Sequence, residues 1–135
     1  MKTIVKWVEN MQMLGESASG HSVIMDGPED LGGENLGIRP MEMLLLGLGG
    51  CTTIDVVSTL KKMREKVSDC RAEISAERAE NHPKIFNKIH IHFVLEGSNL
   101  DAKKVAKAIS LSADKYCSAS IMLGKSAKIT HDFSV

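Results

Sequence analysis

The feature that most restricts the fold of this chain is a long apolar run that begins at Pro40. Proline is favoured at the first position of a helix, where a backbone N–H would have no helical partner anyway. No further proline occurs in residues 41–63, and the three leucines at residues 44–46 leave the first half of the run almost without a polar face. We therefore expect one long helix, which has to be buried.

Short segments before this helix have the composition of strands. Residues 3–9, 11–17 and 21–25 contain β-branched or mixed side chains and are separated by asparagine and glycine, as in a meander. We expect three strands within residues 1–26. Residues 27–39, which are rich in glycine and acidic side chains, are expected to form a loop.

After the long helix, alternation of apolar and polar residues predicts a hairpin. In residues 84–96 isoleucine, phenylalanine and leucine share one face while lysine and histidine share the other, and residues 70–77 alternate in the same way. Their charged faces could pair across an antiparallel ladder. A second helix, with a start like a capping box after Ser98, is expected to end near Cys117. Residues 127–135 alternate again and should form a last strand.

The predicted fold class is α+β, in the order βββ, long helix, ββ, helix, β. A length of 135 residues with 43% hydrophobic content is that of a single domain with its own core. We therefore expect one domain over residues 1–135, in which residues 40–135 carry the helices, the hairpin and the last strand.

Charge and composition restrict the possible partners. The formal net charge is zero and charges of both signs are interspersed, unlike the basic surface of a nucleic-acid or anionic-membrane binder. The longest nearly apolar stretch, residues 41–51, is shorter than the ~20 residues that cross a bilayer, and no secretory leader pattern is visible. Three cysteines are a poor disulfide framework. We expect a cytoplasmic protein without nucleic-acid or membrane partners.

Two cysteines stand where an apolar helical pattern is interrupted. Cys51 follows a pair of glycines, and Cys117 comes near the end of the second predicted helix. A free cysteine is usually a small buried side chain, which is the interpretation we prefer for Cys70. If Cys51 and Cys117 meet in space, however, they could exchange between thiol and disulfide.

The surroundings of Cys51 leave an alternative open. In an unbroken helix Cys51 lies roughly 16 Å from the helix start, where the helix dipole has little effect. Gly49 and Gly50 could instead interrupt the helix and start a new one at Cys51. Asp55 shares a helical face with Cys51, and a carboxylate without a counter-ion disfavours a neighbouring thiolate. A cation near Cys51 therefore becomes more necessary.

Two segments resemble a known family. Residues 39–52 read Arg-Pro-Met-Glu-Met-Leu-Leu-Leu-Gly-Leu-Gly-Gly-Cys-Thr, and residues 111–120 read Leu-Ser-Ala-Asp-Lys-Tyr-Cys-Ser-Ala-Ser. They are similar to the two cysteine motifs of the OsmC/Ohr family of osmotically inducible and organic hydroperoxide resistance proteins, most closely to its YhfA-like branch. The order of predicted elements agrees with that family along nearly the whole chain.

The resemblance implies a thiol peroxidase that acts in oxidative stress defence. Cys51 would be the attacking thiolate and Cys117 the resolving thiol, with a hydroperoxide as substrate and an external dithiol as reductant. The resemblance also implies an intertwined homodimer whose long central helices are packed between sheets. No metal and no bound cofactor are expected.

Two charged residues complete the candidate site. In peroxidase members of the family an arginine and a glutamate assist the first cysteine, and the glutamate directly follows the proline; here Met41 has that place and Glu42 comes next. On a regular helix Glu42 lies about 13 Å from Cys51 and on the opposite face, so only a partner chain could present it. The same holds for Arg39, the nearest cation. The alternative is a catalytically weak or inactive member that binds a small apolar molecule or senses redox state.

One further pair could hold a metal. His90 and His92 point the same way from one predicted strand, but no third ligand is evident beside them in the sequence. We therefore interpret both as ordinary surface histidines.

Overall fold

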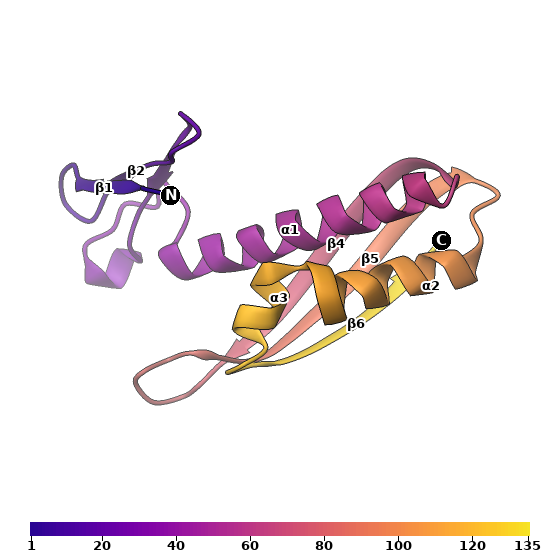
Figure 1. The fold of residues 1–135 in the computed structure, drawn as a ribbon. Helices are drawn as coiled ribbons and strands as arrows, with labels where there is room; N and C mark the ends of the chain where they lie inside the picture. Colours follow the sequence, from indigo (N-terminus) through magenta and orange to yellow (C-terminus); the bar gives the residue numbers. More distant parts are fainter. The chain divides into compact units, whose positions relative to one another are not determined.

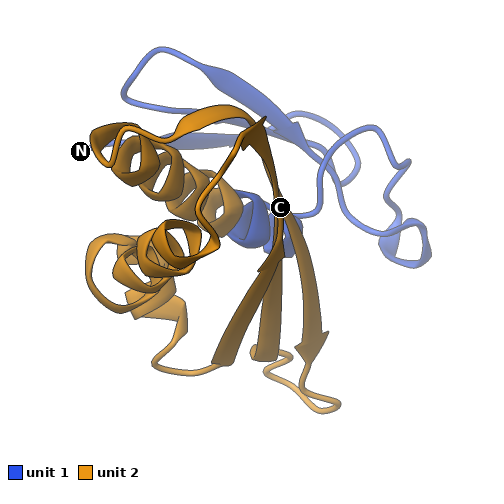
Figure 2. Cartoon of the chain, turned by 90° about the vertical axis from the view of Figure 1, so that its right-hand side faces the viewer, with its two compact units in different colours: residues 1–46 blue, residues 47–135 orange.

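The computed structural model describes all 135 residues and divides into two compact units, residues 1–46 and residues 47–135 (Figure 2). Helix α1, Pro40–Lys62, begins in the first unit and continues into the second. The mixed α/β architecture and the order of the elements agree with the predicted α+β fold (Figure 1). One short helix near the C-terminus was not expected.

The first unit contains a three-stranded antiparallel meander, as predicted. Its strands are β1 (Ile4–Trp7), β2 (Met13–Glu16) and β3 (Ser22–Met25). Asn10 between β1 and β2 and Gly20 between β2 and β3 have positive φ angles of 48° and 86°. Asparagine and glycine tolerate this left-handed backbone better than other residues, so both turns suit their sequence.

A single carboxylate organises the loop that follows. Asp26 is buried and accepts hydrogen bonds from the backbone N–H groups of Gly27, Glu34 and Leu36 at 2.8, 3.1 and 3.1 Å. The N–H of Leu36 is the main cause of a lowered pKa at Asp26, which the other two N–H groups and Arg39 reinforce against the effect of burial. The loop, which includes the 3₁₀ turn η1 (Glu29–Leu31), is thus held through its backbone.

The second unit is built on another three-stranded sheet. Its strands are β4 (Lys66–Arg78), β5 (Phe86–Ser98) and β6 (Lys128–Ser134). β4 and β5 form the predicted antiparallel hairpin, in which Lys88 and Glu77 make an ion pair at 3.4 Å. β6 pairs with β5 in parallel, and the connection between them carries the helices because parallel neighbours require a crossover.

The crossover contains three helical pieces. They are α2 (Ala102–Leu111), the π-helical turn η2 (Ser112–Tyr116) and α3 (Ser118–Leu123). Asp101 caps α2, because its carboxylate accepts the N–H of Lys103 at 2.9 Å. These helices and the later part of α1 cover one face of the β4-β5-β6 sheet (Figure 2). The core lies there, and the apolar face of β5 was predicted correctly: Ile89, Ile91, Phe93 and Leu95 are all buried.

Helix α1 runs without a break from Pro40 to Lys62, which decides against an interruption at Gly49 and Gly50. The expectation that α1 is buried is wrong for a single chain. One stripe with a spacing of four residues is buried, while Ile54, on another face, is 71% exposed. The buried stripe consists of Leu48, Thr52, Val56 and Leu60. A single chain thus supplies packing partners for only one face of this helix.

By length and composition alone, α1 is also able to cross a membrane. An 18-residue window in it has a mean hydropathy of 1.6, and 22% of that window is buried. The nearly apolar stretch of residues 41–51 is only part of this helix, so the prediction from that stretch alone was too short. A core helix of a soluble protein passes the same test, so its exposed face needs a separate explanation.

Candidate functional site

Three side chains with metal-binding or redox chemistry converge in the second unit. Cys51 and Asp55 lie one turn apart on α1, and Cys117 lies between η2 and α3. The two sulfur atoms and one carboxylate oxygen are all within 4.8 Å of one another. The structure thus brings together the two thiols that the sequence singled out, with Asp55 beside them.

Irregular backbone places Cys117. The α2 helix widens into the π-helical turn η2, after which Cys117 adopts an extended conformation with φ −75° and ψ 103°. Its N–H donates to the carbonyl of Ser112 at 2.8 Å, and its sulfur accepts the N–H of Ser120 at 3.4 Å. Cys117 therefore caps α3 with its own thiol. Such π-helical turns are rare and are often found at functional sites.

Two buried hydroxyl groups orient Asp55. The Ser112 hydroxyl donates to Asp55 Oδ2 at 3.1 Å, and Thr52 Oγ1 lies 2.9 Å from Ser112 Oγ. A serine hydroxyl has one hydrogen, so Ser112 donates it to Asp55 and accepts the hydrogen of Thr52. The carboxylate is thus held by a chain of hydrogen bonds that crosses from α1 to η2.

Neither hydroxyl was predicted as part of the site, although the sequence contains a signal for both. Thr52 interrupts the otherwise apolar buried stripe of α1, and Ser112 is likewise buried at the end of α2. A polar group in a buried stripe has to find a partner. Two such residues near the two cysteines could have indicated that they pair with each other.

The two thiols differ in their access to solvent. Cys117 is fully buried, and burial is the main cause of its raised pKa. The Ser120 hydroxyl and N–H act against burial, and the Cys51 thiol adds to it; none of the groups that shift this pKa is a cation. Cys51 is only partly buried. Burial therefore disfavours the thiolate of Cys117, and Cys51 is the more accessible thiol of the two.

The two charged candidates have another local role. Arg39 and Glu42 belong to the first unit, where the N–H of Arg39 donates to Glu42 Oε1 at 2.8 Å. The Arg39 guanidinium donates to the carbonyl of Gly37 at 3.1 Å. Glu42 thus closes the start of α1 in the manner of a capping box. Because α1 is continuous, Glu42 stays about 13 Å along the helix from Cys51 of the same chain.

The third cysteine, Cys70, lies outside the site formed by Cys51, Asp55 and Cys117. Cys70 lies on β4 opposite Leu95 and is partly buried. Burial first, and the charge of Asp69 second, raise the pKa of Cys70. Both effects favour an unreactive thiol, in line with the structural role expected for it.

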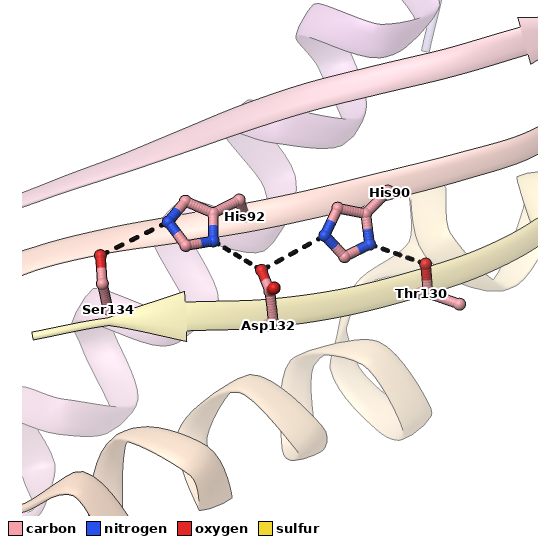
Figure 3. A network of polar contacts seen from close by, with 5 residues as sticks. All are labelled: His90, His92, Thr130, Asp132 and Ser134. Atoms are coloured by element: carbon pink, nitrogen blue, oxygen red, sulfur yellow. Dashed lines mark hydrogen bonds and ion pairs between the residues drawn. The ribbon is translucent and has the colours of Figure 1, made fainter.

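A second polar cluster lies on the sheet (Figure 3). Asp132 Oδ1 on β6 is 2.6 Å from His92 Nδ1 and 3.2 Å from His90 Nε2, both on β5. The other ring nitrogens contact Thr130 at 2.8 Å and Ser134 at 3.4 Å. The hydrogen bond to His92 is the main cause of a lowered pKa at Asp132. We call these five residues the histidine cluster.

Asp132 is the acidic neighbour of both histidines that the sequence did not reveal. Asp132 is 40 residues from His92 and becomes its neighbour only through the parallel register of β5 and β6. The side chains of His90 and Asp132 are 42% and 61% exposed. Both histidines lie on the outer, polar face of the sheet, as expected from their alternation.

Comparisons with known proteins agree with this architecture. The chain matches the family model described as OsmC-like protein over residues 32–132. It is 47% identical to Protein YhfA of Escherichia coli strain K12 over 138 aligned positions, which cover 100% of this chain and 98% of that protein.

Two solved structures of other proteins have the same fold. A hypothetical protein from Aquifex aeolicus VF5 is 30% identical with a TM-score of 0.83, and the match covers 98% of this chain and 95% of that one. An organic hydroperoxide resistance protein OsmC from Legionella pneumophila has a TM-score of 0.75 at 17% identity, over 100% and 98% of the two chains. At that identity the likeness concerns the fold alone.

Proposed function

The chain belongs to the OsmC-like protein family, and from this premise we propose that it reduces hydroperoxides, organic ones in preference, through Cys51 and Cys117. The observation that carries the proposal is the approach of the two sulfur atoms to within 4.8 Å. A disulfide requires about 2.05 Å between the sulfurs, which side-chain rotation and a small backbone shift can supply.

The proposed reaction has two steps in the protein. The thiolate of Cys51, the more accessible thiol, attacks the distal oxygen of the hydroperoxide; the O–O bond breaks, and the alcohol leaves with a proton. Cys51 is now a sulfenic acid. The Cys117 thiol attacks the Cys51 sulfur, the S–O bond breaks, water leaves and a disulfide forms. An external dithiol reduces this disulfide and is itself oxidised.

We propose a homodimer in the cytoplasm as the active form. The outward face of α1 supports it: Ile54 is 71% exposed, and Gly47 and Gly50 face open space. A hollow of about 560 Å³ follows the same helix past Val57. An exposed apolar face next to glycines fits close packing against a second helix. In this dimer Glu42 and Arg39 act on Cys51 of the partner subunit.

Sedimentation tests the dimer. The wild-type protein at micromolar concentration should sediment as twice the mass of 14.7 kDa, and Ile54→Glu should shift it towards monomer because a buried charge opposes association. Lys125→Glu, on an exposed surface, is the matched control and should leave the mass unchanged. A wild-type monomer would refute the dimer.

Peroxide consumption tests the chemistry. With cumene hydroperoxide and an external dithiol, Cys51→Ser should reduce the rate to the background of the reductant, while Cys70→Ser should keep the wild-type rate. In a separate assay without the dithiol, Cys117→Ser should consume one peroxide per chain and carry one added oxygen on Cys51 by mass spectrometry, because the resolving thiol is missing. An unchanged rate in Cys51→Ser would end the proposal.

A specific observation also favours the alternative, a catalytically weak redox sensor. The Asp55 carboxylate lies in the same small space as both sulfurs, and none of the groups that shift the pKa of Cys117 is a cation. A carboxylate so close disfavours a thiolate. A wild-type protein that forms the disulfide no faster than a free dithiol, and turns over no faster, would support the sensor over the enzyme.

A further inference from the structure

We propose that the reduced protein binds one zinc ion through Cys51, Asp55 and Cys117. This inference uses the same two thiols as the proposed peroxide reduction but does not depend on turnover. The three side chains offer one ligand atom each, and those atoms already lie within 4.8 Å of one another.

The separations suit a tetrahedral ion. With zinc–sulfur bonds of about 2.3 Å and zinc–oxygen bonds of about 2.0–2.2 Å, ligand atoms of a tetrahedral site lie roughly 3.5–3.8 Å apart. A contraction of about 1.3 Å at most, within the reach of side-chain rotation, brings the three atoms to these distances.

The ligand types select the metal. Thiolate sulfur favours zinc and other soft or borderline ions over magnesium and calcium, which prefer oxygen ligands. On binding, the two thiols release their protons to solvent and form two zinc–sulfur bonds, and Asp55 adds one oxygen. The fourth position is left for water or an external thiol.

The surrounding hydrogen bonds match those that hold metal ligands in place. Ser112 donates to Asp55 at 3.1 Å and is supported by Thr52 at 2.9 Å. The N–H of Ser120 donates to the Cys117 sulfur at 3.4 Å. Partners of this kind fix ligand orientation and strengthen metal binding, and their loss typically weakens it about 10–100-fold. They also give the proposal a variant that keeps all three ligands.

The histidine cluster is less suited to the ion. Its donor nitrogens both point at Asp132 Oδ1, which occupies the position where an ion would sit, at 2.6 and 3.2 Å (Figure 3). Binding there would require both rings and the carboxylate to separate while remaining exposed to water. We therefore place the ion between the thiols.

Zinc and peroxide chemistry compete for the same two sulfur atoms. A sulfur bound to zinc has lost its free thiolate, and a sulfur in a disulfide is no longer a zinc ligand. The metal would thus protect the reduced pair, and oxidation of the pair would release the metal.

Zinc affinity is measured without peroxide, on the reduced, metal-free full-length protein with a chromophoric chelator as competitor. The wild type should bind one zinc per chain. Cys51→Ser and Asp55→Asn should each weaken binding at least about tenfold, and Ser112→Ala should weaken it about 10–100-fold. Cobalt bound to the wild type should show a thiolate charge-transfer band that Cys51→Ser loses. Cys70→Ser and the double variant His90→Ala, His92→Ala should bind as the wild type does.

A measurement on the wild type avoids dependence on folding of the variants. Stoichiometric zinc should slow alkylation of Cys51 and Cys117 by iodoacetamide, mapped by mass spectrometry, and leave Cys70 unaffected. Zinc binding that survives Cys51→Ser, is lost in the histidine variant, or gives no protection would overturn the inference. A protein that reduces peroxide without binding zinc refutes only the metal site, and one that binds zinc without reducing peroxide refutes only the proposed function.

Discussion

Asp55 and Asp132 are each close to two side chains of a type that binds metals, yet the two carboxylates belong to different kinds of site. Asp55 lies beside two thiols and is held by buried hydroxyls that connect α1 to η2. Asp132 lies between two imidazole rings on an exposed sheet surface. The same number of ligands therefore produces a converging site in one place and a surface hydrogen-bond network in the other.

The backbone explains the difference. His90 and His92 are two residues apart on one strand, about 6.6–6.8 Å, so their rings lean towards the carboxylate between them. Cys51 and Asp55 are one turn apart on a helix, where neighbouring side chains lie about 5–6 Å apart at Cβ, and Cys117 comes from a separate element. Side chains from two packed elements can converge on one point more easily than side chains along one pleated surface.

The first prediction concerns the hydroxyls that support Asp55. Ser112→Ala leaves Asp55 and Thr52 without their shared buried partner, and it should lower the free energy of unfolding by about 1–3 kcal/mol in urea denaturation. Thr52→Val should cost about 1 kcal/mol, because Ser112 still donates to Asp55. In a double-mutant cycle the two losses should not add, since both substitutions break the same bond. Full additivity would show that the hydroxyls act independently.

The smaller effect is expected at the histidine cluster. The pKa of Asp132 is lowered, chiefly by the hydrogen bond to His92, so its contribution to stability is present above the unfolded pKa of about 3.9. That contribution is lost as the pH falls through the lower folded value. Asp132→Asn should therefore cost less than Ser112→Ala at neutral pH, and the gap from the wild type should close in acid.

Urea denaturation at pH 7 and at pH 3 measures this gap. Glu80→Gln, at an exposed position in the β4–β5 turn, is the control and should show little change at either pH. If Asp132→Asn costs as much as Ser112→Ala, or if its cost grows in acid, the contrast between the two carboxylates would be wrong.

Local patterns were enough to predict most of the fold. Alternation identified the apolar face of β5, and Pro40 marked the start of α1. The missing pieces depend on long-range geometry: the parallel register that joins Asp132 to His92, and the exposure of Ile54 on a helix that looks fully apolar. A hydropathy pattern shows that an apolar face has to be buried, but it does not show which other element buries that face.

The candidate site was predicted in part for the same reason. The cysteines were recognised from the segments around them, and Asp55 from its helical spacing to Cys51. Ser112 was missed as a support because its bond to Asp55 spans 57 positions. Arg39 and Glu42 were chosen as charges near Cys51, whereas in the structure Glu42 caps the start of α1 and Arg39 holds Gly37.

Because Cys117 follows the π-helical turn η2, its position depends more on the number of residues in η2 than on which residues they are. Residues 114–116 are exposed, so many substitutions there should be tolerated. Deleting one of them would allow ordinary helical winding to continue and would rotate everything beyond it by about 100° around the axis. Cys117 would then lose its position beside Cys51, and the deletion of one residue would separate the sulfurs more effectively than any point substitution nearby.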